Sequence, residues 1–170
     1  MRIVDVVLVI PFLPLMILLG SFIGPSLSTL IIVISVTSWA APARVIRAQT
    51  LSVKQDDYVH AARAIGARKG HIMLRHILPG VLPLCLAQFV SATSAAILTE
   101  AALSFLGLGD PLTKSWGTML QFAQARGAFF TGSWVWWVIP PGLCITAATL
   151  GFALTGFVLE EILDPRLSNA

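Results

Sequence analysis

Charge is the scarcest feature of this chain. Asp, Glu, Lys and Arg make up 11% of its 170 residues, whereas hydrophobic residues make up 56%. Soluble domains usually carry about 25% charged residues. The few charges cannot cover a water-facing surface, so the composition argues against an ordinary soluble domain. It predicts an all-α, polytopic membrane protein formed by a single domain, residues 1–170.

Residues that could support cofactor or covalent chemistry are equally scarce. The two cysteines, Cys85 and Cys144, lie inside apolar stretches, and their spacing matches no metal site. The chain has no GxGxxG motif and no Walker A lysine motif. We therefore expect no cofactor, no bound metal and no catalytic residue. An intramembrane enzyme is poorly supported, because Glu100 has no intramembrane His, Asp or second Glu to work with.

Four apolar stretches are each long enough to cross a bilayer: 6–24, 27–43, 80–103 and 134–159. Pro11 and Pro14 should kink the first stretch, and Pro140-Pro141-Gly142 should interrupt the last one near its outer end. A cleaved signal peptide is disfavoured because no A-x-A pattern follows the first stretch. The sequence thus predicts about four transmembrane helices.

Basic residues predict how these helices are oriented. Seven of the eleven Lys and Arg residues lie in loop 44–79, and only two lie in segment 104–133. The positive-inside rule places loop 44–79 in the cytoplasm. With four spans, both termini are also cytoplasmic, and segment 104–133 packs at the outer membrane surface. The net charge of +3 therefore indicates membrane orientation, and we expect no nucleic-acid partner.

Polar residues in the third span are candidates for the translocation pathway or its gate. Ser91 and Ser94 either pack against neighbouring helices or line a polar path. Glu100 is an acid within an apolar stretch, which makes it a functional candidate. About twenty residues beyond Gly80, it should lie near the opposite interface, where it can also simply reach water.

Loop 44–79 contains two short predicted helices. Asp56 or Asp57 can cap a helix over Tyr58–Ile65. Gly66 and Gly70 interrupt the pattern before a second helix over His71–Leu78, and Pro79 and Pro83 mark the return to the membrane. The partly apolar second helix suits either a lipid surface or a groove in a soluble partner, and its spacing does not decide between them.

Several motifs resemble those of a known transporter family. Ala61-Ala62, Gly66 and Ile77-Leu78-Pro79 resemble the EAA loop of ABC importer permeases, with His60 in place of the family's leading glutamate and His76 three residues before the proline. Other motifs resemble the dipeptide, oligopeptide and nickel branch: Arg2-Ile3-Val4-Asp5, LTEAALSFLGLGDP, Ser115-Trp116-Gly117 and Leu163-Asp164-Pro165-Arg166. The resemblance covers essentially the whole chain.

The resemblance implies a type I ABC importer permease of the prokaryotic inner membrane that carries peptides. Its expected partners are ABC ATPase subunits, a second permease subunit, an extracytoplasmic solute-binding protein and membrane lipid. ATP hydrolysis would belong to the separate ATPase, so the chain itself is not an enzyme. The residues implied in ATPase coupling are His60, Ala61, Ala62, Gly66, Ile72, His76, Ile77, Leu78 and Pro79.

Two alternatives remain at this point. Nickel importer permeases share the same landmarks, so a nickel substrate stays open. Permeases of this branch usually have further N-terminal spans before the Arg2-Ile3-Val4-Asp5 match. A truncated or split-gene membrane scaffold without independent transport is therefore the other alternative.

Overall fold

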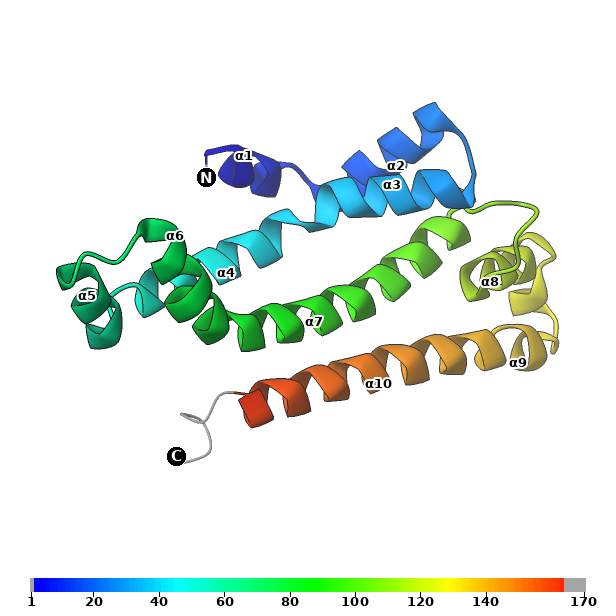
Figure 1. Ribbon diagram of the computed structural model, residues 1–170. Coiled ribbons are helices and arrows are strands. Elements are labelled where there is room, and N and C mark those ends of the chain that lie inside the picture. The colour runs from blue at the N-terminus through cyan, green and yellow to red at the C-terminus, as the bar shows by residue number, and fades with distance from the viewer. Residues whose placement is uncertain (1, 164–170) are drawn as a thin grey trace.

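The computed structural model describes residues 2–163, which form helices joined by turns (Figure 1). In chain order the elements are α1 (Arg2–Val9), α2 (Phe12–Ile23), α3 (Leu27–Ser38), α4 (Ala40–Val53), α5 (Asp57–Ala64), α6 (Lys69–Ile72), the π-helix η1 (Met73–Ile77), α7 (Leu78–Phe105), α8 (Trp116–Ala125), the 3-10 helix η2 (Ala128–Phe130), α9 (Trp134–Trp137) and α10 (Ile139–Leu163). The expected cytoplasmic C-terminal end and the motif at Asp164-Pro165-Arg166 lie outside the described residues.

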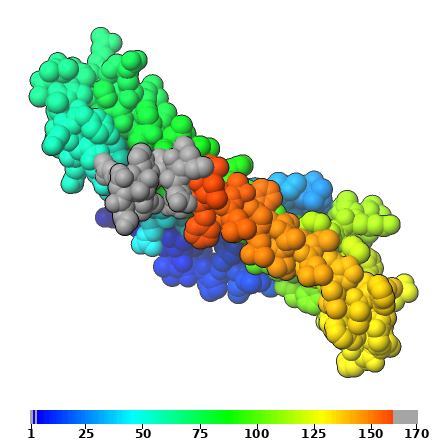
Figure 2. Space-filling view, turned by 90° about the horizontal axis from the view of Figure 1, so that it is seen from below, coloured from blue at the N-terminus to red at the C-terminus, as the bar shows by residue number. Residues whose placement is uncertain are grey.

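Three long helical rods give the protein its shape. By length and composition, three helices of the described chain can cross a membrane: Leu27–Val53, Lys69–Phe105 and Trp134–Leu159. The helix α7 lies between α4 on one side and α10 on the other, and it contacts both (Figure 1). Elements α5 and α6 lie at one end of this elongated molecule, and α8 and α9 lie at the other (Figures 1 and 2).

The first apolar stretch, 6–24, is not one span-length helix. The chain leaves the helical conformation at Ile10 and Pro11, and this divides the stretch between α1 and the shorter apolar helix α2. Pro11 has no N–H to donate, and its ring would clash with a preceding helical carbonyl. Pro14 lies in the first turn of α2, where a missing N–H leaves no bond unmade.

The third stretch also differs from its predicted bounds, 80–103. Helix begins at Lys69 and continues through η1 into α7 without an interruption at Pro79 or Pro83. Leu78 N–H donates to the carbonyl of Met73, five residues earlier, so the turn just before Pro79 is wider than an α turn. A proline ring normally clashes with the carbonyl four residues earlier, which here belongs to Arg75 within η1. The wide turn relieves that clash.

Loop 44–79 is likewise shorter than predicted. Residues 44–53 belong to α4, which extends the second predicted span, 27–43, from Ala40 to Val53. The stretch 134–159 coincides with the third membrane-length rod. This rod begins with α9 and turns at Val138, so that Pro140 and Pro141 fall in the first turn of α10.

Small and hydroxyl residues join α7 to α10. Ser94 Oγ donates a hydrogen bond of 3.0 Å to the backbone carbonyl of Thr149. A Cβ on the buried Gly156 would lie 3.5 Å from Val90 and 3.7 Å from Ser91 Oγ, so the two helices approach closely at this level. In lipid, where apolar burial drives association weakly, such close packing and interhelical hydrogen bonds hold helices together.

A second contact joins α7 to α2 and α3. Met16, Leu30, Val33 and Leu103 form a buried cluster, and Leu108 packs against it. Leu108 is directed there by the end of α7, where Gly107 has a φ of +88°. Leu108 N–H donates to the Leu103 carbonyl and Gly107 N–H to the Ser104 carbonyl, a Schellman motif.

We expect Ser94→Ala to weaken the association of α7 with α10 by about 0.6 to 1 kcal/mol, the usual contribution of an interhelical hydrogen bond in a membrane. Reversible unfolding in detergent would measure the loss. Thr93→Ala is the matched control, because the Thr93 hydroxyl bonds the carbonyl of Phe89 in its own helix. Equal stability of the two variants would show that the Ser94 bond contributes nothing.

Candidate functional site

The basic hairpin, residues 57–79, has a small apolar core of its own. Val59, Ala62 and Ile72 are buried against one another, and Ala67 and Ile77 pack on them. These residues come from α5, from the turn after it and from α6–η1. The core fixes the angle between the two arms, so the hairpin is a folded unit and not a loose loop.

Gly66 makes the turn between the two arms. Its φ is +80°, a region that residues with a Cβ rarely adopt. Gly66 N–H donates to the Arg63 carbonyl at 3.1 Å, and Ala67 N–H donates to the Ala62 carbonyl at 3.1 Å. This is a second Schellman motif, and its characteristic apolar contact between Ala62 and Ala67 is part of the hairpin core.

The base of the hairpin rests on the membrane-length helices. Tyr58 Oη lies 3.5 Å from the His76 carbonyl, and the two rings are 6.2 Å apart. A Cβ on Gly80 would lie 3.3 Å from Val53 at the end of α4 and 3.6 Å from Tyr58 Oη. The hairpin is thus held at its base by both α4 and α7.

The residues predicted to couple to an ATPase are divided between the core and the surface of the hairpin. Ala62 and Ile72 are buried, and His76 and Ile77 are half-buried. The exposed ones are His60, Ala61, Gly66, Leu78 and Pro79. The structure therefore brings the nine residues into one folded unit, in which Ala62 and Ile72 form part of the core and the exposed ones face outward.

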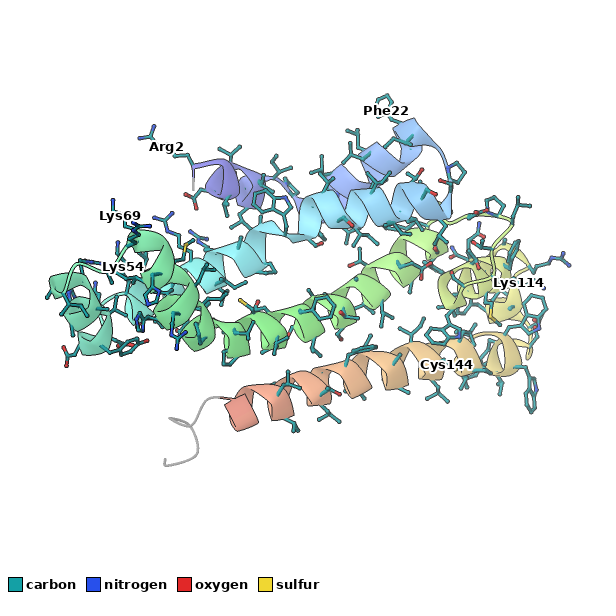
Figure 3. All side chains as sticks on the ribbon, viewed as in Figure 1. Arg2, Phe22, Lys54, Lys69, Lys114 and Cys144 are labelled. Carbon is teal, nitrogen blue, oxygen red and sulfur yellow. The ribbon has the colours of Figure 1, made fainter. Side chains whose placement is uncertain are left out.

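Sequence reasoning missed the most exposed apolar side chain of the hairpin. Ile65 is 85% exposed beside the Gly66 turn, and Met73 and Leu74 of η1 are also exposed. Arg63, Arg68, Lys69 and Arg75 are exposed in the same unit. Figure 3 labels Lys69 at this end of the molecule and Lys114 at the opposite end. A signal for Ile65 was available, since a large apolar residue directly before a turn glycine has no helix face to pack on.

The candidate pathway residues of α7 do not converge on one site. Ser94 bonds the backbone of α10, as described above. Ser91 is exposed and lies near Gly156 of α10. Glu100 lies further along α7, is half-buried, and accepts a hydrogen bond of 2.6 Å from Ser104 Oγ. Only Glu100 is therefore joined to the end of α7 that meets α8.

The start of α8 packs against this end of α7. Ser115 caps α8 in a capping box with Thr118, and the helix begins at Trp116. Trp116, Trp134, Trp136 and Trp137 are exposed around α8 and α9, where the aromatic belt of a membrane interface is expected. The motifs that form the contact between α7 and α8, LGLGDP and Ser115-Trp116-Gly117, were identified from the sequence only as a resemblance to the family, and the contact itself was not predicted.

Metal ligands do not gather in the described part of the chain, where no three His, Cys, Asp or Glu residues are arranged to hold an ion. Cys85 is half-buried and Cys144 is exposed, and both are free. His71 and His76 stack edge to face at 5.7 Å, within the hairpin.

Comparison with known proteins identifies the family to which this chain belongs. The model of the family described as "Binding-protein-dependent transport system inner membrane component" matches residues 1–169. The chain belongs to this family. It is an all-helical membrane component, in agreement with the fold expected from its composition and motifs.

Relatives in this family are named as peptide permeases. A peptide transport system permease protein of Brucella suis is 39% identical over 168 residues, which are 98% of this chain and 55% of the relative. The dipeptide transport system permease protein of Bacillus subtilis is 35% identical over 168 residues, which are 98% of this chain and 52% of that protein. The chain thus spans about half the length of the curated relatives it matches.

For this family member we expect Gly66→Ala to destabilise the hairpin by about 1 to 2 kcal/mol, because a Cβ is disfavoured at positive φ. Amide hydrogen exchange in α5 should rise correspondingly. Gly70→Ala is the matched control: both sites have open space for a Cβ, and only Gly66 has a positive φ. Similar exchange in the two variants would contradict the turn as described.

Proposed function

We propose that this chain is a permease subunit of an ATP-driven importer of peptides. The observation that carries the proposal is the basic hairpin, a folded unit with exposed apolar and basic side chains, held rigidly against α4 and α7. Family membership and the peptide permease names of the relatives support the same conclusion. Hydrolysis of ATP belongs to a separate partner subunit.

The orientation follows from charge. The hairpin and the preceding helix end contain seven of the eleven Lys and Arg residues, so this end faces the cytoplasm. The opposite end, with α8, α9 and the exposed tryptophans, then faces outward. ATPase subunits would meet the hairpin, and an extracytoplasmic solute-binding protein would meet the α8 end. A second permease subunit would complete the pathway across the membrane.

The hairpin suits docking into a cleft on an ATPase subunit. Ile65, Met73 and Leu74 offer exposed apolar contacts. The surrounding Arg63, Arg68, Lys69 and Arg75 favour a cleft with acidic rims. Because the hairpin has a packed core and a fixed base, a force applied at its tip moves α7 instead of deforming the hairpin. No covalent step is required of this chain.

Co-purification with the ATPase subunit tests this proposal. We expect Ile65→Asp to weaken ATPase binding by about 2 kcal/mol, or about 30-fold, as for a central apolar contact of an interface. Leu112→Asp is the matched control, because Leu112 is 92% exposed and lies in the turn between α7 and α8, outside the hairpin. An unaltered chain that binds no ATPase would instead favour a membrane scaffold.

Glu100 provides a separate test of the pathway. In Glu100→Gln the amide oxygen can still accept the Ser104 hydrogen bond, so thermal stability should stay unchanged while the charge is lost. We expect ATP-driven peptide uptake to fall about tenfold, equivalent to about 1.4 kcal/mol in the rate-limiting barrier. Asp110→Asn is the control, since Asp110 accepts from Leu112 N–H in an exposed turn. Normal uptake by Glu100→Gln would remove Glu100 from the pathway.

A further inference from the structure

One unbroken helix connects the basic hairpin to the opposite end of the molecule. The helix Lys69–Phe105 has 37 residues and includes the second arm of the hairpin. At 1.5 Å per residue it is about 55 Å long. Pro79 and Pro83 do not interrupt it, so a displacement at the hairpin is carried along α7 toward Glu100 and Ser104.

At the far end, two glycines let other parts of the chain press directly on this helix. A Cβ on Gly117 of α8 would lie 2.5 Å from the Ala101 carbonyl oxygen and 2.8 Å from Ser104 Cβ. A Cβ on Gly109 would lie 2.6 Å from Ser104 Oγ and 2.9 Å from Thr118 Cγ2. We call Ala101, Ser104, Gly109, Gly117 and Thr118 the glycine clamp; all five are buried.

Polar groups fix the orientation of the clamp residues. Ser104 is only 1% exposed, and its hydroxyl donates to Glu100 in the preceding turn of α7. Thr118 Oγ1 accepts from Ser115 N–H at 2.8 Å, while Ser115 Oγ accepts from Thr118 N–H at 3.2 Å. The capping box therefore fixes the first turn of α8 at the point where it meets α7.

In α8 the small side chains are buried and the large apolar ones are exposed, which is the reverse of a helix in a soluble protein. Small residues, Gly117, Thr118 and Ala123, are buried, whereas Trp116, Met119 and Phe122 are exposed. The face of α8 that approaches α7 thus consists of small residues, and the large side chains of α8 stay outside the contact. A helix seated in this way follows the element that it touches.

We propose that the glycine clamp makes α8 move as one body with the outer end of α7, so that a displacement of the basic hairpin reaches the outward face through a single helix. Gly109, Gly117 and Ser104 are positioning residues in this role and do not bind the transported peptide. The inference rests on the proposed function, because it requires an ATPase that moves the hairpin.

Spin-label distances in the assembled transporter test the proposal. One label pair, Leu98→Cys with Gln124→Cys, spans α7 and α8 at exposed positions, and a second pair, Leu82→Cys with Leu98→Cys, lies within α7. Cys85→Ser and Cys144→Ser remove the native thiols. We expect the first distance distribution to be narrow and identical in the nucleotide-free and the vanadate-trapped states. A change between the states would overturn the proposal.

Gly117→Ala should release α8 from α7. The distribution between positions 98 and 124 should broaden, the one between 82 and 98 should stay narrow, and uptake should fall about tenfold, the order of effect that overpacking by one methyl group causes. Gly132→Ala is the control, because a Cβ there meets nothing within 4 Å. A narrow distribution and normal uptake in Gly117→Ala would contradict the clamp.

Three further outcomes keep the tests separate. If Gly117→Ala also disrupts the distance within α7, Gly109→Ala is used in its place, because Gly109 lies in the turn between the two helices. It should broaden the distribution between positions 98 and 124 and leave the one between 82 and 98 narrow, and a narrow distribution between 98 and 124 would contradict the clamp. If the unaltered chain binds no ATPase, the proposed function fails and the transmission fails with it. If the ATPase binds but the α7–α8 distance changes with nucleotide, only the clamp is overturned.

Discussion

The helix from Lys69 to Phe105 is the element against which the other long helices are placed. It contacts α4, α3, α8 and α10, and it carries the second arm of the basic hairpin. Inside a bilayer, every backbone N–H and carbonyl must be bonded within the protein, and a continuous helix satisfies most of these groups internally. The basic hairpin and the contact with α8 are consequently attached to one helix.

Small residues make close contacts with this rod at three levels. Gly80 meets Val53 near the hairpin, Gly156 meets Val90 in the middle, and Gly117 meets Ala101 at the far end. Apolar side chains gain little from leaving lipid for a protein interior that is equally apolar. Close packing of backbones therefore stabilises the contacts between helices, as hydrophobic burial does in soluble proteins. Because large apolar side chains need not be buried for this, many of them remain exposed.

Prolines illustrate how much local sequence can predict. Pro11 ends a helix, as a residue without an N–H should. Pro79 was expected to mark a boundary as well, yet the helix passes through it by widening the preceding turn into η1. Contacts around Pro79 accompany the difference: Gly80, directly after it, lies against Val53, and the carbonyl of His76, within the wide turn, accepts a hydrogen bond from Tyr58 Oη.

The amino-acid sequence by itself determined the class of the protein, its helical content and the turn at Gly66, because these depend on composition, run length and local backbone preference. It also predicted the short helix that precedes that turn. Only the tertiary structure decided that Ser94 bonds α10, that Ile65 is exposed, and that Gly117 seats against Ala101. These contacts depend on the rotation of each helix about its axis, and in a chain with apolar residues on every face no periodic pattern specifies that rotation.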